Sequence, residues 1–508
     1  MMRSSQSPSK ELTTSVGHNQ QLLAELLGNS SDLVFQELPL AASNRKAIAV
    51  YLKGLVDQKF LFNRVYEVIS SQLLNDAGEN QRPYLERVNW FVQYASTFAQ
   101  AFHTTNVEQI ISELLHGNTC ILIEEHAGAM VFGTSKEKSR SPEEPQSEAL
   151  VRGPRIGFVE DLTENTALMR RRIKDPHLTF DSLIIGRRGR KEVVICYLRG
   201  VVNPDLVEEV RRRLKAIDID DPIESGYIEN YIQDHKYSPF PQIQNTERPD
   251  RVEGALLEGR VAILMEGTPF SLIVPVTFPM LMQSPEDYYE RWIPTTLIRV
   301  LRYLALFFAL FLPSLYIALV SYHQGLLPTK LAISIAGSRE GVPFPTLFEA
   351  LIMEVTIELL REAGVRLPKP VGQAVGIVGG LVIGQSAVEA GIVSPIMVIV
   401  VSLTAISSFA FPQYAVAISI RLLRFVMMFA ASVLGLYGII LIFVLITSHM
   451  VKLYSFGVNY AAPYASTQHF SWKDLFIRAP LHLLLKHRPA MLKSLDRTRS
   501  GLSKKKGD

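Results

Sequence analysis

The sequence is poor in the residues that build metal and redox sites. Its 508 residues include only two cysteines, Cys120 and Cys196, each in a short apolar run typical of a strand. Two cysteines so far apart give no zinc-type spacing, and we interpret them as buried free thiols in a reducing compartment. The 11 histidines are scattered without a ligand pattern. We therefore expect no metal site and no cofactor.

Motifs for catalysis and for nucleic-acid binding are also scarce. No glycine-rich phosphate loop follows an expected strand, and the turn at residues 186–189 is better explained as a hairpin loop than as a phosphate clamp. The formal net charge is only +3, so no basic surface for nucleic acid is expected. We therefore expect neither an enzyme nor a nucleic-acid-binding protein.

The first half of the chain has no long apolar run. Residues 1–20 are polar, are expected to form a disordered arm, and lack the apolar core of a signal peptide. Residues 21–133 and 149–292 alternate short apolar runs with amphipathic segments, which indicates two mixed α/β subdomains. The charged, Ser- and Pro-containing stretch 134–148 is typical of a linker. We expect this half to lie in the cytosol.

Hydrophobic periodicity predicts the elements of both subdomains. The expected strands are 47–52, 119–124, 129–132, 182–186, 192–198, 260–265 and 270–274. The expected helices are 21–27, 61–74, 165–173 and 204–215. The last of these begins with Pro204, a residue that suits the first turn of a helix because an amide donor is not needed there.

The second half is dominated by apolar runs. A helix needs about 20 apolar residues to cross the hydrocarbon core, and we predict an α-helical, polytopic membrane domain at 293–451. The expected spans are 297–320, 371–390, 393–411 and 425–448. Trp292 would anchor the first span at the interface, and Arg299 and Arg302 would extend to the lipid headgroups. Residues 452–508 form a basic tail, which the positive-inside rule places in the cytosol.

Four glycines in the run 371–390 are spaced by four residues. On a helix they would form one smooth stripe, which allows another helix backbone to approach closely. We therefore predict a helix-packing face made of Gly372, Gly376, Gly380 and Gly384.

The segment 346–363 is helical in pattern but too charged for a lipid-facing span. Its apolar stripe consists of Phe348, Ile352, Val355, Leu359 and Ala363. Its opposite side carries Glu354, Glu358 and Arg361, flanked by Glu349 and Glu362. Such a helix lies at the membrane interface or lines a polar cavity with its charges inward. An i,i+3 salt bridge between Glu358 and Arg361 explains that pair equally well.

Topology favours four spans plus this one amphipathic helix. Both the N-terminal half and the basic tail should be cytosolic, which requires an even number of crossings. The arrangement leaves several basic residues outside, in conflict with the same rule: Arg361, Arg366, Lys369, Arg421 and Arg424.

Long strings of the sequence resemble the A subunit of GerA-family spore germinant receptors. In the first half these are VRGPRIGFVEDLTENTALMRRRIKDPHL (151–178), ALLEGRVAILMEGTPFSLIVPVTF (255–278) and SPEDYYERW (284–292). In the second half they are SREGVPFPTLFEALIMEVTIELLREAGVRLPKPVGQAVGIVGGLVIGQSAVEAGIVSP (338–395) and SFGVNYAAPYAS (455–466). The resemblance extends from about residue 30 to about residue 485.

The resemblance implies a place in the inner membrane of a bacterial spore, where the chain would help to trigger germination. It implies two partner subunits, a transporter-like B subunit and a C lipoprotein, besides membrane lipid. It also implies a homo-oligomer that conducts monovalent cations when a nutrient binds.

The residues themselves suggest where a pore would form. A ring of helices 346–363 would present Glu354 and Glu358 to cations, while Val355 and Leu359 would close the pore by dewetting. Arg361 and Glu362 are further gating candidates, and which helix side faces the lumen is open. The alternative is a non-conducting scaffold that passes the signal between subunits. A secondary transporter is less favoured, because the membrane half lacks two similar halves.

Overall fold

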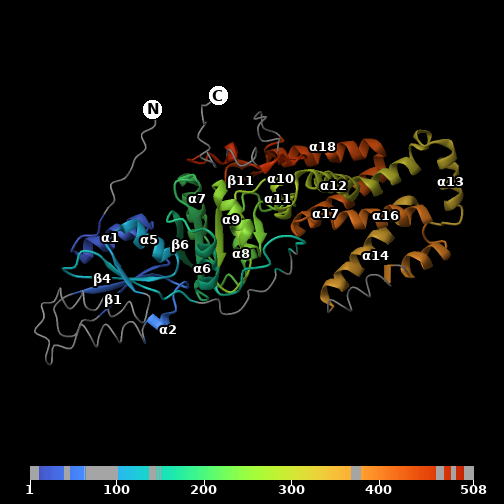
Figure 1. Cartoon of the computed structure of the whole chain (residues 1–508). Helices are drawn as coiled ribbons and strands as arrows, with labels where there is room; N and C mark the ends of the chain where they lie inside the picture. Colours follow the sequence, from blue (N-terminus) through green and yellow to red (C-terminus); the bar gives the residue numbers. More distant parts are fainter. Residues whose placement is uncertain are drawn as a thin grey trace, which may run out of the picture. The chain divides into compact units, whose positions relative to one another are not determined.

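The structure, a computed structural model, describes the greater part of the chain (Figure 1). The described residues are 11–38, 46–61, 63, 101–136, 145, 148, 150–367, 379–380, 382–464, 474–481 and 488–496. Contacts divide the chain into two units. Unit 1 comprises 1–233, 243–275 and 485–508, and unit 2 comprises 234–242 and 276–484.

Unit 1 begins with a five-stranded antiparallel sheet in the order β1-β2-β4-β5-β3. The strands are β1 (Leu33–Leu38), β2 (Ala47–Leu52), β3 (Phe102–Thr104), β4 (Thr119–Ile123) and β5 (Ala129–Phe132). Alternate residues of β2 and β4 pack on the helices α1 (Val16–Leu26) and α5 (Val107–Leu115), and the others form a second apolar cluster on the opposite face. The predicted strand 47–52 and the predicted hairpin of β4 and β5 are confirmed.

A second five-stranded antiparallel sheet follows, in the order β6-β7-β9-β10-β8. Its strands are β6 (Leu178–Ile185), β7 (Lys191–Leu198), β8 (Gln244–Thr246), β9 (Val261–Met265) and β10 (Ser271–Val274). The helices that accompany it are α6 (Leu162–Arg172), α7 (Pro204–Lys215), α8 (Ser225–Ile232) and α9 (Pro249–Glu258). Asn203 caps α7 by accepting a hydrogen bond from the amide of Asp205, which explains why the predicted bounds 204–215 are confirmed.

A buried salt bridge joins the two halves of unit 1. Arg170 of α6 is fully buried, and its Nε lies 2.7 Å from Oδ2 of Asp32 in the turn before β1. Its Nη2 donates to Oδ1 of the same carboxylate and to Oγ of Ser30, both at 2.9 Å. The guanidinium also lies over the ring of Phe180, 4.9 Å from its centroid. The two predicted subdomains are therefore packed together within one unit.

Unit 2 is mainly helical, and its long helices share one apolar core. They are α12 (Trp292–Ser321), α13 (Thr329–Arg339), α14 (Thr346–Arg366), α16 (Pro395–Ser408), α17 (Tyr414–Leu434) and α18 (Leu436–Lys452). By length and apolar composition, α12 and α17 are the two described helices able to cross a membrane. The apolar helices α16 and α18 are shorter, with 14 and 17 residues.

Hydrogen bonds fix the directions of these helices. Tyr322, just after α12, donates its hydroxyl to the carbonyl of Ser432 near the end of α17, at 2.5 Å. The starts of α14 and α16 lie at the same end of α12, because Ser321 contacts Thr346 and Tyr316 contacts Ser394, both at 3.4 Å. Thus α12 and α17 run in one direction, and α14 and α16 run in the other.

The predicted span 425–448 is wrong, because a break at Gly435 divides it between α17 and α18. Gly435 has a φ of +60°, and a Cβ at this position would lie 2.6 Å from Cε1 of His323. Glycine alone tolerates both the positive φ and the close approach. The predicted helices 297–320 and 346–363 are confirmed as α12 and α14, and 393–411 contains α16. Much of the predicted span 371–390, and most of the predicted helix 61–74, lie outside the described residues.

The start of α12 differs from the prediction. Arg299 and Arg302, expected to reach the lipid headgroups, are only 1% and 8% exposed. Both donate to the carboxylate of Asp287 in α11 (Glu286–Tyr289), at 3.0 and 2.9 Å, and Arg299 also binds Asp474 at 2.7 Å. The carboxylate of Asp287 accepts hydrogen bonds from both guanidiniums, so neither arginine needs to reach water or lipid headgroups.

Two predicted domain boundaries also move. Residues 276–292 belong to unit 2, because Asp287 is tied to α12 by the arginines just described. Part of the predicted tail, residues 485–508, belongs to unit 1. There Arg488 donates to the carbonyl of Leu257 at 2.7 Å, and Ser494 donates to the carbonyl of Glu258 at 3.0 Å.

The buried salt bridge of unit 1 yields a stability prediction. Replacing the guanidinium in Arg170→Met leaves the Asp32 carboxylate buried without its cation, so the free energy of unfolding should fall by about 3–5 kcal/mol. Arg172→Met is the matched control in the same helix, because its partner Glu253 is partly exposed, and it should cost less than about 1 kcal/mol. Chemical denaturation followed by circular dichroism measures both. Equal effects of the two variants would contradict the assignment.

Candidate functional site

The helix α14 has its charged side buried and its apolar side exposed. Glu349 and Glu354 are 0% and 1% exposed, whereas Val355 and Leu359 are 47% and 66% exposed. In a water-soluble protein an amphipathic helix has the reverse orientation. Here the charged side packs on α16 and α17, and the apolar side is left without a partner among the described residues.

The buried side of α14 forms an ion-pair network with α17. Glu354 lies 2.7 Å from Arg424, and Glu358 lies 2.8 Å from Arg421 and 3.5 Å from Arg424. Arg361 completes the network by binding Glu358 at 3.0 Å, as the i,i+3 spacing predicted, and by donating to Oγ of Ser408 at 3.0 Å. We call these five ionisable residues the charge cluster. It holds three arginines and two carboxylates, so one positive charge is in excess.

A second buried carboxylate fixes the start of α14. Glu349 accepts a hydrogen bond from the amide of Ser394 at 2.7 Å, at the N-cap of α16, and lies 3.4 Å from Arg339. The sequence placed Glu349 only at the flank of the charged side. The signal that could have located its partner is the Ser394-Pro395 start of the next helix, whose amides need an acceptor.

The structure brings together some of the predicted pore residues and separates others. Glu354, Glu358 and Arg361 meet in the charge cluster, while Val355 and Leu359 lie on the exposed side of the same helix. Glu362 is exposed and pairs with Arg366 at 2.5 Å. Arg421 and Arg424 were not predicted as site residues. The sequence did contain a signal for them. Two arginines at i,i+3 in an apolar run need buried partners, and Glu354 and Glu358 lie at the similar spacing i,i+4 on α14.

The predicted glycine stripe is described only in part. Gly384 is buried, and a Cβ built on it would lie 3.7 Å from Cγ1 of Val398 in α16, whereas Gly380 is exposed with open space around it. Gly372 and Gly376 lie outside the described residues. The stripe as a packing face stays a prediction.

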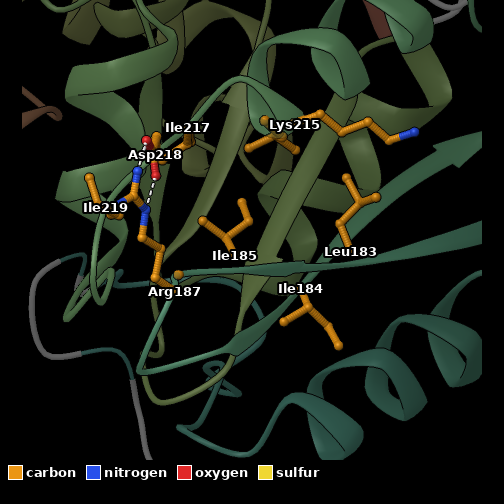
Figure 2. Close-up of a pocket in the computed structure, with 10 residues that line it drawn as sticks. Leu183, Ile184, Ile185, Arg187, Lys215, Ile217, Asp218 and Ile219 are labelled. Carbon is orange, nitrogen blue, oxygen red and sulfur yellow. Dashed lines mark hydrogen bonds and ion pairs between the residues drawn. The ribbon is translucent and has the colours of Figure 1, made fainter.

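A small groove of about 250 Å³ lies in unit 1 beside the end of β6 and the segment that follows α7 (Figure 2). Its walls are mainly aliphatic, and Arg187 forms a salt bridge with Asp218 at its rim, while Lys215 points away from this pair. The amides of Arg187 and Arg188 donate to carbonyls of residues 219 and 220, both at 2.9 Å. These amides are unable to cradle a phosphate, and the turn between β6 and β7 is the hairpin loop that the sequence predicted.

Two histidines meet at the edge of the first sheet. The Nε2 atoms of His103 in β3 and His126 in the β4–β5 turn lie 2.9 Å apart. Burial lowers the pKa of both imidazoles, and the proximity of His103 lowers that of His126 further. Within the described part of the chain, no third histidine, cysteine or carboxylate completes a metal-binding group around them. The charge cluster is therefore the better candidate for a functional site.

The charge cluster yields a double-mutant prediction. Glu354→Gln removes the nearer of the two carboxylates that face the buried guanidinium of Arg424 and leaves only Glu358, at 3.5 Å. Thermal unfolding of the chain in detergent should therefore occur several degrees lower, equivalent to a loss of about 3 kcal/mol. Adding Arg424→Gln to that variant should restore part of the loss, because both charges are then removed. Glu362→Gln, an exposed carboxylate on the same helix, serves as the control. Additive losses in the double variant would show that Glu354 and Arg424 do not interact.

Comparison with known proteins relates nearly the whole chain to one family. The family model described as Bacillus/Clostridium GerA spore germination protein matches residues 21–491. Spore germination protein GerLA of Bacillus cereus is 45% identical, over 93% of this chain and 94% of that protein. Spore germination protein B1 of Bacillus subtilis is 43% identical, over 94% and 97%. Spore germination protein A1 of the same species is 52% identical, over 74% and 78%.

One similar solved structure covers the first half of the chain. It is the N-terminal domain of the A subunit of the Bacillus megaterium spore germinant receptor GerK3, which is 32% identical to this chain. The match covers 53% of this chain and 98% of that one, with a TM-score of 0.42.

Proposed function

The chain belongs to the GerA family of spore germination proteins, and from this premise we propose that it is the A subunit of a nutrient-gated cation channel. It would act as an oligomer in the spore inner membrane, with a transporter-like B subunit and a C lipoprotein as partners. The family relationship supports the receptor role, because curated relatives matched over almost their full length are spore germination proteins. The first half and the basic tail would face the cytosol.

The two unlike sides of α14 carry the channel proposal. An exposed apolar stripe gains nothing from facing water, so it contacts lipid or the same stripe of other copies. In a symmetric ring of copies, Val355 and Leu359 would meet at the axis and form an apolar constriction. A narrow apolar constriction stops ions by excluding water, without any mechanical plug.

The charge cluster provides the second half of the gating proposal. In the state described here, both carboxylates are bound by arginines and are unavailable to cations. Glu354 is 1% exposed, but the side chain of Glu358 is 28% exposed, so Glu358 needs the smaller movement to reach a lumen. We infer that α14 rotates when the channel opens and that this rotation breaks the Glu358–Arg421 pair. Carboxylates of α14 then replace Val355 and Leu359 along the conduction path.

The predicted glycine stripe suits such a movement. Helices that pack through glycine slide past one another with few side chains to displace. A Cβ built on Gly384 would lie 3.7 Å from Cγ1 of Val398 in α16, so a side chain at this position would fill the space between the two helices. The stripe formed with Gly372, Gly376 and Gly380 would let the neighbouring helix follow α14 when the pore opens.

The proposal predicts opposite effects for the two sides of α14. In liposomes containing the purified receptor, Leu359→Asn should raise the basal potassium flux severalfold, because a polar side chain wets the closed constriction. Glu354→Gln with Glu358→Gln should instead lower the preference for cations over anions in the open state. Flux is measured with a potassium-sensitive dye before and after addition of nutrient.

Matched variants control for disturbance of the membrane domain. Leu441→Asn changes an exposed leucine on α18 (51%), and Glu389→Gln removes an exposed carboxylate outside α14. Neither should change the flux. If the double glutamine variant keeps the conductance and selectivity of the wild type, Glu354 and Glu358 are not pore residues.

A non-conducting scaffold remains the alternative function, and cross-linking separates the two. Both native cysteines are fully buried, so new cysteines placed one by one at Gly372, Gly376, Gly380 and Gly384 can be cross-linked selectively. A symmetric ladder of links between copies of this chain supports the channel. Links only to the other subunits support a scaffold that relays the nutrient signal.

A further inference from the structure

The charge cluster is incomplete as a set of ion pairs. It combines Arg361, Arg421 and Arg424 with only two carboxylates, Glu354 and Glu358. Arg424 is 1% exposed, yet its Nε and Nη1 atoms have no hydrogen-bond partner among the described residues, and neither does Nε of Arg361. A buried guanidinium with unused donors is unfavourable unless an acceptor completes its shell. Oε1 of Glu354 in the same cluster also lacks a partner among the described residues, so three unused donors stand against one unused acceptor. A group with several oxygen acceptors and negative charge would match this imbalance.

The surroundings of the cluster limit what that anion can be. Arg361 lies over the ring of Phe409 at 5.0 Å, and Arg421 lies over the ring of Tyr414 at 5.6 Å. These two rings are 71% and 63% exposed. Two aliphatic side chains of α17 are also exposed, by 47% and 57%: Ile418 and Leu422. The basic cluster is thus bordered by an apolar surface that no described part of the chain covers.

The cluster is also accessible from one side. The side chains of Arg361 and Arg421 keep 12% and 11% of their surface exposed, and that of Glu358 keeps 28%. Its place along the helices is near one end of unit 2, because Ser419, two residues before Arg421, donates a hydrogen bond to the carbonyl of Pro239 in the segment 234–242. Basic pockets between membrane helices near the headgroup level are typical sites for acidic lipids.

We propose that the charge cluster binds the phosphate of an acidic phospholipid, with Arg361, Arg421 and Arg424 as donors. The phosphate receives the unused N–H groups and balances the excess positive charge. The acyl chains lie on the exposed apolar surface of α17. Because the phosphate competes with Glu358 for Arg421, bound lipid weakens the salt bridge between Glu358 of α14 and Arg421 of α17.

This inference rests on the membrane location proposed above, but not on the channel activity. The lipid is therefore tested by binding rather than by flux. The full-length chain is purified in a neutral detergent and transferred to nanodiscs of phosphatidylcholine, prepared either with or without phosphatidylglycerol as the acidic lipid. Thermal unfolding and the number of lipids retained in native mass spectrometry are recorded.

The wild type should retain phosphatidylglycerol in preference to phosphatidylcholine and should unfold at a higher temperature in the acidic nanodiscs. Arg361→Gln with Arg421→Gln should weaken retention on the order of tenfold, because two of three donors are lost. Arg421→Lys keeps the charge and should retain part of the binding. Arg366→Gln is the control for general attraction to an acidic surface, because Arg366 lies on the same helix, outside the cluster and 77% exposed, and it should bind as the wild type does.

Three results would overturn the proposal. The first is equal retention of both lipids by the wild type. The second is an equal loss in Arg366→Gln and in the double glutamine variant. The third is a full thermal shift produced by inorganic phosphate in phosphatidylcholine nanodiscs, which would assign the cluster to a free anion instead. Failure of the flux prediction with intact lipid selectivity would reject the channel alone.

Discussion

The structure depends on one electrostatic constraint: a charge removed from water must be matched by a partner of opposite sign. Arg170 with Asp32 meets this constraint in unit 1, and Arg299 with Asp287 and Arg424 with Glu354 meet it in unit 2. All six side chains are 5% exposed or less. Removing one member of such a pair is costly because the other stays buried. The first and third pairs therefore fix how two segments distant in the sequence are packed, and the second fixes how α11 packs against the start of α12.

The same constraint explains the orientation of α14. Its carboxylates need cations, and the nearest cations are the arginines of α17, so the charged side turns inward and the apolar stripe turns outward. A helix of this kind is stable only where its outer face meets lipid or another apolar surface. The orientation of α14 thus agrees with the membrane location that we propose for unit 2.

The charge cluster also connects stability with function. A network with more arginines than carboxylates is easier to rearrange than one with equal numbers. Another acceptor can take the place of Glu358 beside Arg421, and no arginine is then left without an anionic partner. In our proposals the excess of arginines allows both gating and lipid binding. Both processes act on the side of α14 that faces α17. The groove and the histidine pair of unit 1 lack a comparable set of unused donors within the described residues.

The sequence by itself determined the elements and the family. The strands 47–52 and 129–132 and the helix 204–215 were predicted with their observed limits, because local periodicity and capping residues decide them. The long strings from 151 to 466 carried the resemblance that the family model bears out. The amphipathic pattern of 346–363 also predicted a helix with one charged side.

Only the tertiary structure decided the partners of those charges. Nothing local to Glu354 indicates Arg424, which lies 70 residues later, and Arg299 looked like a headgroup contact until Asp287 and Asp474 were placed beside it. The break at Gly435 was hidden within an unbroken apolar run, because its cause is the approach of His323. Hydrophobic patterning senses only the immediate neighbours along the chain, whereas ion pairs and close contacts are set by segments that meet after folding.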